Sequence, residues 1–165
     1  MKLILTGSPG TGKTTIAKRL AKKLGCAVVN ERDLALEKGI GKWDHAGSEL
    51  VIPLGALKRV ASTELKKHKN IILEGHVLCE VKLPADAVIL LRTHPELLEA
   101  RLSGRRYAAE KVQDNVFCEG IDYCKKHALR KYGPKKIIEV RNEKGIKETL
   151  SNILKELRRR EIIEQ

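Results

Sequence analysis

The sequence predicts an α/β fold in which a mainly parallel sheet is covered by helices on both faces. Two observations predict it. Short, continuous apolar runs alternate along the chain with longer segments of helical periodicity. Strands that follow one another in this way need crossover helices and therefore run parallel. With 165 residues, of which 42% are apolar and 33% charged, the chain fits one globular domain and is unlike a disordered protein.

The first part of the chain predicts a strand, a glycine-rich turn, a helix and a second strand. Leu3, Ile4 and Leu5 form an apolar run typical of a strand buried on both faces. Apolar residues then recur at helical spacing up to Gly25, which stands where a glycine commonly ends a helix. The elements expected here are a strand over 2–6, a helix over 13–24, a strand over 26–29, and short helices over 33–38 and 57–67.

The second part of the chain continues the alternation of strands and helices. Pro95 suits the first turn of a helix. The elements expected here are strands over 71–73, 87–91 and 137–140, helices over 95–103 and 110–129, and a last helix carrying apolar residues from 146 to 157. Ligands of such folds bind at the carboxyl ends of the strands, so we expect a site at the turn that begins with Gly7.

Charge and composition limit the partners and the location. The net charge of +12 should attract polyanions such as nucleotides or nucleic acid, although a solvated lysine-rich surface has the same charge. No apolar run approaches the ~20 residues of a membrane helix, and the segment before Gly7 is too short for a signal peptide. We therefore expect a cytoplasmic protein without a membrane partner. The four cysteines have no metal-binding spacing and are expected to be reduced thiols.

The turn after the first strand carries a phosphate-binding motif. Residues 7–14 read GSPGTGKT and fit the pattern G-x-x-x-x-G-K-[ST] at every fixed position. Glycines such as Gly10 and Gly12 let the backbone wrap so that successive N–H groups form an anion nest at the start of a helix. A glycine-rich turn without a ligand is the alternative. The motif predicts a nucleoside triphosphate as ligand and leaves the phosphate acceptor open.

The side chains after the motif glycines have predicted roles toward ATP and Mg²⁺. Lys13 should reach the β and γ phosphates as a point charge. The Thr14 hydroxyl can ligate Mg²⁺, and Thr15 can add a hydrogen bond to the α phosphate. Glu74 ends the apolar strand 71–73 and is the expected acidic partner of the metal, while His76 could orient a water or a phosphate. A structural role remains open for both Glu74 and His76.

A basic segment predicts a lid over the phosphates. Four arginines, Arg92, Arg101, Arg105 and Arg106, cluster between the fourth strand and the following helix. Arg101 and Arg105 are four residues apart and should share a helix face, from which they could stabilise the transferring phosphoryl group. The alternative is a solvated basic surface.

The chain resembles the adenylate-kinase-like P-loop proteins over nearly its whole length. It most closely resembles archaeal members of the branch called adenylate kinase isoenzyme 6, or coilin-interacting nuclear ATPase protein. The residues that carry the resemblance are 7–15, Asp33-Leu34, Glu74-Gly75-His76, Leu91-Arg92-Thr93, 101–107 and 114–119.

The resemblance implies a three-layer nucleoside monophosphate kinase fold with a five-stranded parallel sheet. It implies an insert that binds the monophosphate at about 30–53 and a short lid at about 103–113, within a single domain. Residues 141–144 occupy the place where related kinases contact adenine, largely through backbone, so Asn142 is a candidate nucleotide contact. The implied activity is broad-specificity nucleoside monophosphate kinase with ATPase activity, AMP being the first acceptor. The implied setting is late maturation of the small ribosomal subunit, with a ribosomal protein of the uS11 type as partner.

Three departures separate this chain from the resemblance. Related adenylate kinases clamp the monophosphate with one arginine shortly after the aspartate that matches Asp33 and another after the third strand. Here Ala35 and Leu36, and Val77 and Leu78, stand at these places, so no bidentate clamp is visible. The branch usually has Asp in place of Glu74 and Gly in place of Arg106. A P-loop ATPase that acts as an assembly factor, with negligible kinase activity, is therefore an alternative function, and an RNA-binding module without turnover is another.

The partner surface is expected on the insert. Its acidic residues, Glu31, Glu37, Asp44 and Glu49, could bind a basic ribosomal protein while the basic remainder of the chain faces rRNA. ATP-driven closure of lid and insert would then change the affinity for that partner.

Overall fold

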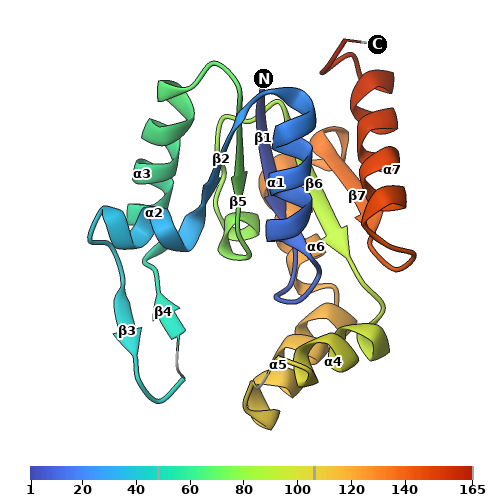
Figure 1. Ribbon diagram of the computed structural model, residues 1–165. Helices are drawn as coiled ribbons and strands as arrows, with labels where there is room; N and C mark the ends of the chain where they lie inside the picture. Colours follow the sequence, from blue (N-terminus) through green and yellow to red (C-terminus); the bar gives the residue numbers. More distant parts are fainter. Residues whose placement is uncertain (48, 106, 165) are drawn as a thin grey trace.

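The chain folds around a five-stranded parallel sheet, as predicted. The computed structural model describes residues 1–47, 49–105 and 107–164. The strand order is β2-β5-β1-β6-β7 (Figure 1). The strands are β1 (Lys2–Thr6), β2 (Ala27–Asn30), β5 (Ile71–Glu74), β6 (Ala87–Arg92) and β7 (Ile137–Arg141). β1 lies at the centre, and its Leu5 is opposite Glu74 of β5, so Glu74 lies beside the turn that follows β1.

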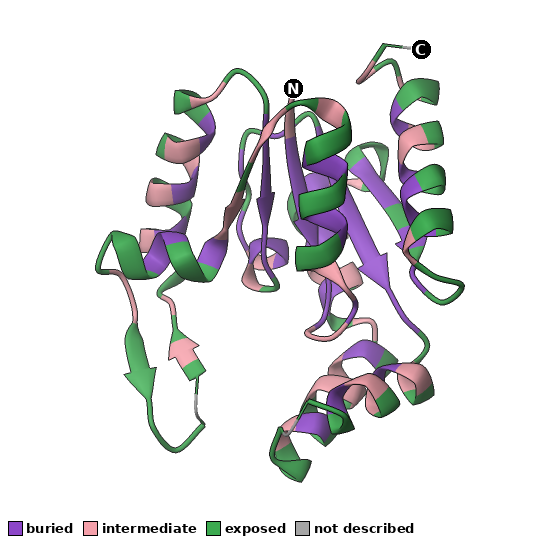
Figure 2. Cartoon of the chain, in the orientation of Figure 1, coloured by how far each residue is buried: buried purple, intermediate pink, exposed green. Residues whose placement is uncertain are grey.

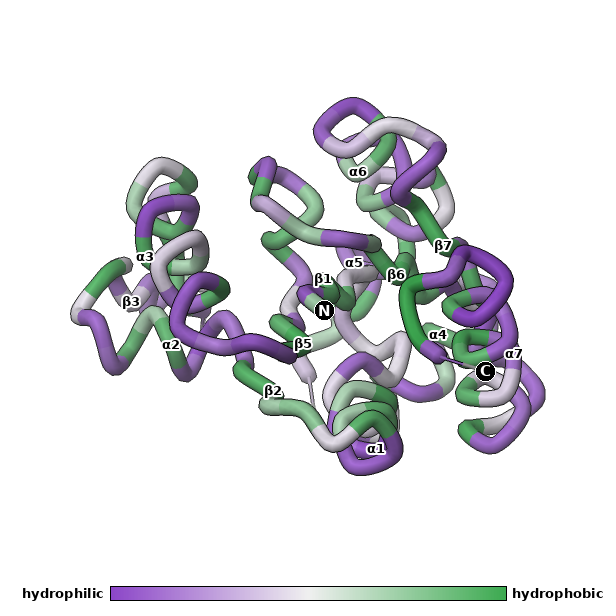
Figure 3. Tube along the Cα trace, turned by 90° about the horizontal axis from the view of Figure 1, so that it is seen from above, coloured by the Kyte–Doolittle hydropathy of each residue, from purple (hydrophilic) through white to green (hydrophobic). Residues whose placement is uncertain are grey.

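Helices cover both faces of the sheet, which gives three layers. The helices α1 (Lys13–Leu24) and α7 (Ile146–Arg159) pack on one face, and α3 (Leu54–Lys67) and α6 (Tyr123–Tyr132) pack on the other. Figure 3 shows the two helix layers on opposite sides of the strands. Leu3 and Leu5 belong to the first core and Ile4 to the second, because successive strand side chains point to opposite faces. The three central strands β5, β1 and β6 are accordingly almost fully buried, whereas the edge strand β2 is partly exposed (Figure 2).

Two smaller units extend past the carboxyl edge of the sheet (Figure 1). One consists of α2 (Glu31–Glu37) and the antiparallel hairpin β3 (Lys42–Asp44) and β4 (Glu49–Val51), within the range of the expected insert. The other consists of α4 (Pro95–Ser103) and α5 (Ala109–Gly120), which share a small apolar cluster of their own. The hairpin is mostly exposed (Figure 2).

The sequence predictions fail at two places. The single helix expected over 110–129 is wrong, because α5 and α6 are separated at Asp122, whose φ of 60° lies in the left-handed region and ends helical geometry. Asp122 is held there by the guanidinium of Arg92, a long-range contact that periodicity does not reveal. The hairpin and two short 3₁₀ helices, η1 (Val77–Glu80) and η2 (Pro134–Lys136), were not predicted.

Candidate active site

The P-loop after β1 is held in shape by neighbouring elements as well as by its own backbone. Gly12 has a φ of 95°, and a Cβ there would lie 2.5 Å from Nδ2 of Asn142. A Cβ on Gly10 would lie 2.8 Å from the side chains of Leu98 and Leu102 on α4. Both positions therefore require glycine for space as well as for backbone conformation. The motif glycines allow close packing of α4 and of the segment after β7 against the loop.

Lys13 begins α1 and lies across the P-loop. Its Nζ donates a hydrogen bond to the carbonyl of Ser8 at 2.9 Å, and the same carbonyl accepts from the Thr11 hydroxyl at 2.8 Å. Burial lowers the pKa of Lys13, while the nearby Cys124, Glu74 and Glu31 act in the opposite direction. Thr15, in the same first turn, is exposed. The ammonium is thus held at the loop whose N–H groups would receive phosphate.

Thr14 and Glu74, the two residues predicted to serve a metal ion, are brought together. The Thr14 hydroxyl donates to Oε1 of Glu74 at 2.9 Å, and Nδ2 of Asn30 donates to the same oxygen at 2.7 Å. A hydroxyl and a carboxylate are hard oxygen ligands of the kind that Mg²⁺ takes beside nucleotide phosphates. The described residues contain no group of three or more His, Cys, Asp or Glu side chains able to hold a metal. The pair therefore fits a metal that also needs oxygens from a nucleotide and from water.

Glu31 fixes the segment that follows Glu74. Its carboxylate is only 2% exposed and accepts backbone hydrogen bonds from Val77 at 3.0 Å and Leu78 at 3.1 Å. Gly75 must be glycine, because a Cβ would lie 2.0 Å from Cδ of Glu31. Burial raises the pKa of Glu31 to about 7. The expected role of Glu31 in an acidic partner surface is therefore wrong, since the side chain is buried under the loop after β5.

His76 lies at the edge of the same network. Its Nδ1 is 3.2 Å from Oε1 of Glu31, and its carbonyl accepts from the thiol of Cys79 at 3.2 Å. Desolvation, together with the charges of Lys13 and Lys111, lowers the pKa of the imidazole. His76 is thus a neutral hydrogen-bonding group at neutral pH, as a residue that orients a phosphate or a water would be.

These residues border one cavity of about 300 Å³ at the carboxyl edge of the sheet. The cavity reaches from the P-loop past the ends of β2 and β5 to the hairpin and the start of α5. Its lining residues are Pro9, Gly10, Lys13, Thr14, Asn30, Glu31, Arg32, Glu49, Leu50, Ile52, Glu74, Gly75, His76, Tyr107, Lys111 and Asn115. The site therefore has a phosphate-binding end and a second end built by the insert, with room for a small polar ligand.

Comparison with known proteins identifies the family. Residues 3–122 match the AAA domain family. A Pyrococcus furiosus protein provisionally named adenylate kinase is 44% identical over 140 residues, which are 85% of this chain and 74% of that protein. A Thermococcus kodakarensis protein with the same name is 41% identical over 160 residues, which are 96% of this chain and 86% of that protein. The chain belongs to this adenylate-kinase-like family.

Solved structures of other kinases share the fold of this adenylate-kinase-like chain. A gluconokinase from Sinorhizobium meliloti has a TM-score of 0.65 and 14% identity, covering 96% of this chain and 91% of its own. A shikimate kinase from Aquifex aeolicus has a TM-score of 0.63 and 14% identity, covering 98% and 99%. At such identity these likenesses concern the architecture alone.

Asn142 connects the last strand of this adenylate-kinase-like chain to the P-loop. Its side chain is buried, donates to the carbonyl of Thr11 at 2.9 Å and accepts from the Thr149 hydroxyl at 2.9 Å. The guanidinium of Arg101 donates to the Asn142 carbonyl at 2.7 Å and to the Thr93 hydroxyl at 3.2 Å. Asn142 thus positions the P-loop through its side chain. Arg101 lies beside this segment and outside the lining of the cavity.

The arginine cluster predicted as a lid divides into separate parts. Arg92 is 5% exposed and pairs with Glu119 at 2.6 Å, so its assignment to the lid is wrong. Glu119 also accepts from the Ser8 hydroxyl at 2.6 Å, which connects α5 to the P-loop. Arg105 is exposed in the turn after α4, which ends at Ser103, so Arg101 and Arg105 do not share a helix face. Arg106 lies outside the described residues.

The insert of this adenylate-kinase-like chain supplies a cation that sequence reasoning missed. Arg32 lines the cavity from the first turn of α2, and Lys111 lines it from α5. The positions of the family's arginine clamp carry no cation here, because Leu36 is exposed on α2 and Val77 binds Glu31 through its N–H. A basic residue just before Asp33 was the available signal, and only the fold shows that it faces the cavity.

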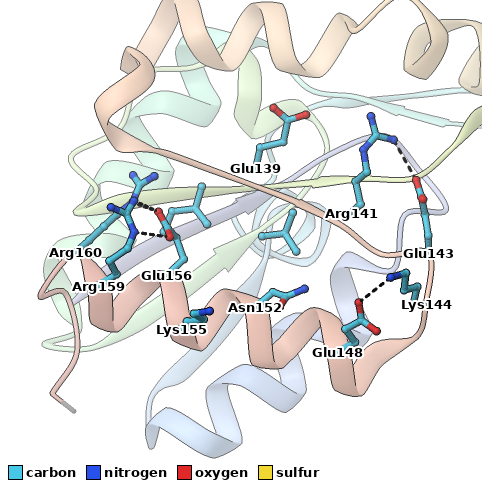
Figure 4. A pocket seen from close by; sticks show the side chains of 12 residues that line it. Glu139, Arg141, Glu143, Lys144, Glu148, Asn152, Lys155, Glu156, Arg159 and Arg160 are labelled. Atoms are coloured by element: carbon cyan, nitrogen blue, oxygen red, sulfur yellow. Dashed lines mark hydrogen bonds and ion pairs between the residues drawn. The ribbon is translucent and has the colours of Figure 1, made fainter.

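Two larger surface grooves lie away from this chemistry. A groove of about 650 Å³ runs between β7 and α7, where charged side chains pair with one another (Figure 4). Glu156 binds Arg159 and Arg160, and Arg141 binds Glu143. A second groove, between α1 and α7, is lined largely by lysines and aliphatic residues. Among the described residues, no helix is both long and apolar enough to cross a bilayer.

Proposed function

We propose that this protein transfers the γ-phosphoryl group of ATP to a nucleoside monophosphate, with AMP as the first candidate acceptor. The observation that carries the proposal is the single cavity that joins the P-loop to the basic end built by the insert. A P-loop alone serves many phosphate reactions. The extension of the same cavity to Arg32 and Lys111, beyond the P-loop, favours transfer to a small acceptor that carries a phosphate.

The donor side of the mechanism rests on the P-loop and its neighbours. Successive loop N–H groups and Lys13 would hold the β and γ phosphates of ATP, with Lys13 exchanging the Ser8 carbonyl for phosphate oxygen. Thr14 and Glu74 would hold Mg²⁺, which supplies neutralisation of charge between the β and γ phosphates when bound. Asn30 keeps the Glu74 carboxylate turned toward Thr14 by its 2.7 Å hydrogen bond. Asn142 and Glu119 keep the loop backbone in place from behind.

The acceptor side rests on groups that reach over the same cavity. The neutral imidazole of His76 would donate a hydrogen bond to the incoming phosphate. It would accept one instead where that phosphate carries a proton. Arg105, with Arg101 behind the P-loop, would add positive charge as the turn between α4 and α5 closes over the phosphates. Water would be excluded from the reacting phosphates by the hairpin, which carries Glu49, and by the segment that enters α5, which carries Tyr107 and Lys111.

A coupled assay tests this proposal. Turnover is measured with ATP and Mg²⁺ alone, and then with AMP, GMP, CMP, UMP or dAMP added. Faster ADP formation with a monophosphate, accompanied by the matching nucleoside diphosphate, is the expected result. ADP formation that is the same with and without every monophosphate would leave only ATP hydrolysis and would reject the transfer.

A second candidate function is a P-loop ATPase that acts in late maturation of the small ribosomal subunit. The net charge of +12, which suits an rRNA environment, is the observation that favours it. Its partner would be a ribosomal protein of the uS11 type, held by exposed acidic residues of the insert such as Glu37 and Asp44. A pull-down of that protein in the nucleotide-free, ADP and ATP-analogue states, repeated with Glu37→Lys and Asp44→Lys together, tests it. Equal capture in all states and in both proteins would reject this function.

A further inference from the structure

Arg32 occupies a defined place at the acceptor end of the cavity. The side chain of Asn30 caps α2 by accepting from the backbone N–H groups of Arg32 at 2.9 Å and Asp33 at 3.1 Å. This cap fixes the backbone of Arg32 in the first turn, and Asn30 also binds Glu74. The position of Arg32 is therefore tied to the donor half of the site by a single intervening side chain.

The guanidinium of Arg32 is held by an aromatic face. Its Cζ lies 5.4 Å from the centroid of the Trp43 ring on β3, a cation–π arrangement. Among the described residues, none gives this guanidinium a carboxylate or carbonyl partner. Arg92 differs, because its guanidinium is fully engaged by Glu119 and Asp122. Stacking on a ring leaves the N–H groups of Arg32 available to an anion while restricting where the side chain can lie.

We propose that Arg32 binds the phosphate of the acceptor nucleotide and that Trp43 is its positioning residue. The proposal rests on the proposed kinase function and names the residue that replaces the clamp absent at Leu36. The phosphate of a monophosphate has the planar O–P–O edge that an arginine fork binds with two hydrogen bonds. Lys111 lines the same cavity, where its ammonium lies 3.8 Å from the Glu49 carboxylate. In this assignment the acceptor is recognised through its phosphate.

Kinetics of four variants test the assignment. Arg32→Ala should raise the KM for AMP by about 10-fold or more, because a charge-assisted hydrogen bond is lost. Arg32→Lys keeps the positive charge but loses the planar guanidinium that forms two parallel hydrogen bonds. Its KM for AMP should therefore lie between the values of the wild type and of Arg32→Ala. Trp43→Ala should raise the KM several-fold with a smaller change in kcat, and Trp43→Phe, which keeps a ring, should be close to wild type. Lys42→Ala is the matched control, since Lys42 is exposed beside Trp43 and points to the other side of the strand.

Calorimetric titration with AMP distinguishes a failure of the Arg32 assignment from a failure of the proposed kinase function. If the wild type transfers phosphate and Arg32→Ala has an unchanged KM for AMP, the assignment of Arg32 is overturned and the kinase function stands. If the wild type transfers to no monophosphate, the kinase function fails, and AMP is titrated calorimetrically into the wild type and Arg32→Ala. Weaker binding by at least about 10-fold in the variant would support the phosphate site. Equal affinity, or no binding by the wild type, would overturn it.

A separate observation concerns two buried thiols. Sγ of Cys124, at the start of α6, lies 3.0 Å from Sγ of Cys79 in η1. Both thiols also point toward the carbonyl of His76, at 3.2 Å for Cys79 and 3.7 Å for Cys124. Cys26 and Cys118 lie elsewhere and are half-buried, and none of the four cysteines is in a disulfide in this structure. The pair joins the loop after β5 to a helix on the sheet face, and catalysis as proposed does not use it.

We infer that Cys79 and Cys124 are a site of reversible disulfide formation with a peroxide as oxidant. The Cys124 thiolate would attack a peroxide oxygen, which breaks the O–O bond and gives a sulfenic acid and hydroxide. The Cys79 sulfur would then attack Sγ of Cys124, which forms the S–S bond, breaks the S–O bond and releases water with the Cys79 proton. The bond would fix η1, and with it the His76 carbonyl, against α6.

Peptide mapping of the peroxide-treated protein tests the pair directly. The expected result is one Cys79–Cys124 disulfide, a fall from four titratable thiols to two on denaturation, and a rise in Tm of roughly 5–10 °C that dithiothreitol reverses. The double variant Cys26→Ser, Cys118→Ser should show the same disulfide and the same rise in Tm, with its two thiols falling to none, while Cys124→Ser should lose the shift. Four remaining thiols, or a disulfide that involves Cys26 or Cys118, would overturn the inference.

Discussion

The donor and acceptor halves of the site are built in contrasting ways. On the donor side, Ser8, Glu74 and Asn142 are each no more than 4% exposed and are hydrogen-bonded to other elements. On the acceptor side, Arg32 lies on the short helix α2 and Trp43 lies on the exposed hairpin. One cation–π contact joins the two side chains. A packed site leaves a recognisable sequence motif, because each of its residues is constrained by several neighbours. A site on the surface leaves none.

Packing also explains why the two halves should respond differently to mutation. Donor residues have buried hydrogen bonds on several sides, so their replacement should alter both stability and turnover. Acceptor residues have few contacts within the protein, so their replacement should alter ligand affinity alone.

Lys13→Ala should lower ATP turnover by roughly 30- to 1,000-fold, because a positive charge that stabilises the transferring phosphate is lost, at about 2–4 kcal/mol. Steady-state kinetics measure the loss and thermal unfolding checks the fold. Lys18→Ala, on the exposed face of α1, is the control and should keep full activity. A folded Lys13→Ala protein with more than about a tenth of the wild-type turnover would show that the phosphate site is misassigned.

Glu31→Gln should remove a pH dependence of stability. The folded pKa of about 7 lies above the ordinary value of 4.5, so Glu31 favours folding most below about pH 4.5 and loses this contribution as the pH rises to about 7. The difference in free energy of unfolding between wild type and variant should therefore change by up to about 3 kcal/mol across that range.

Thermal or urea unfolding of both proteins between pH 4.5 and 7.5 measures this difference. The pKa of His76, whose ring contacts Glu31, is measured by NMR in both proteins so that its contribution can be subtracted. Parallel stability curves for the two proteins would contradict the raised pKa of Glu31.

Gly75→Ala should destabilise the fold by about 1–3 kcal/mol, because the new Cβ meets the buried Glu31 carboxylate. Tm should fall by roughly 3–10 °C. Gly55→Ala is the matched control, since nothing lies within 4 Å of a Cβ there and Gly55 is in a helix, so Tm should stay or rise slightly. An equal response of the two variants would mean that the Glu31–Gly75 contact does not constrain the site.

Arg105→Ala should have the smallest effect, a loss of roughly tenfold in kcat with a smaller change in the Kd for ATP. The reason is that an exposed charge in the turn after α4 acts only when the turn closes over the phosphates. Equilibrium binding of ATP and steady-state kinetics are measured together. A weaker Kd with unchanged kcat would make Arg105 a ground-state contact and would extend the donor half to this turn.

The sequence predicted most of the fold because local signals agreed with the tertiary arrangement. The helix over 13–24 and its glycine end match α1 and Gly25, which has a φ of 60°. The helix begun by Pro95 matches α4. Where a long-range contact decided the structure, local signals failed. Asp122 is kept in a left-handed conformation by Arg92, and the predicted single helix breaks there.

The P-loop motif, and Thr14 and Glu74 as candidate metal-ion ligands, can be predicted from the sequence alone. Both follow from residues at fixed spacing beside strands whose carboxyl ends must meet at one edge. Only the tertiary structure decided that Glu31 is buried, that Arg92 is structural and that Arg32 faces the cavity. The physical reason is that burial and charge pairing are set by neighbours distant in sequence. Glu31 and Gly75 are 44 positions apart, and one residue's packing depends on the other.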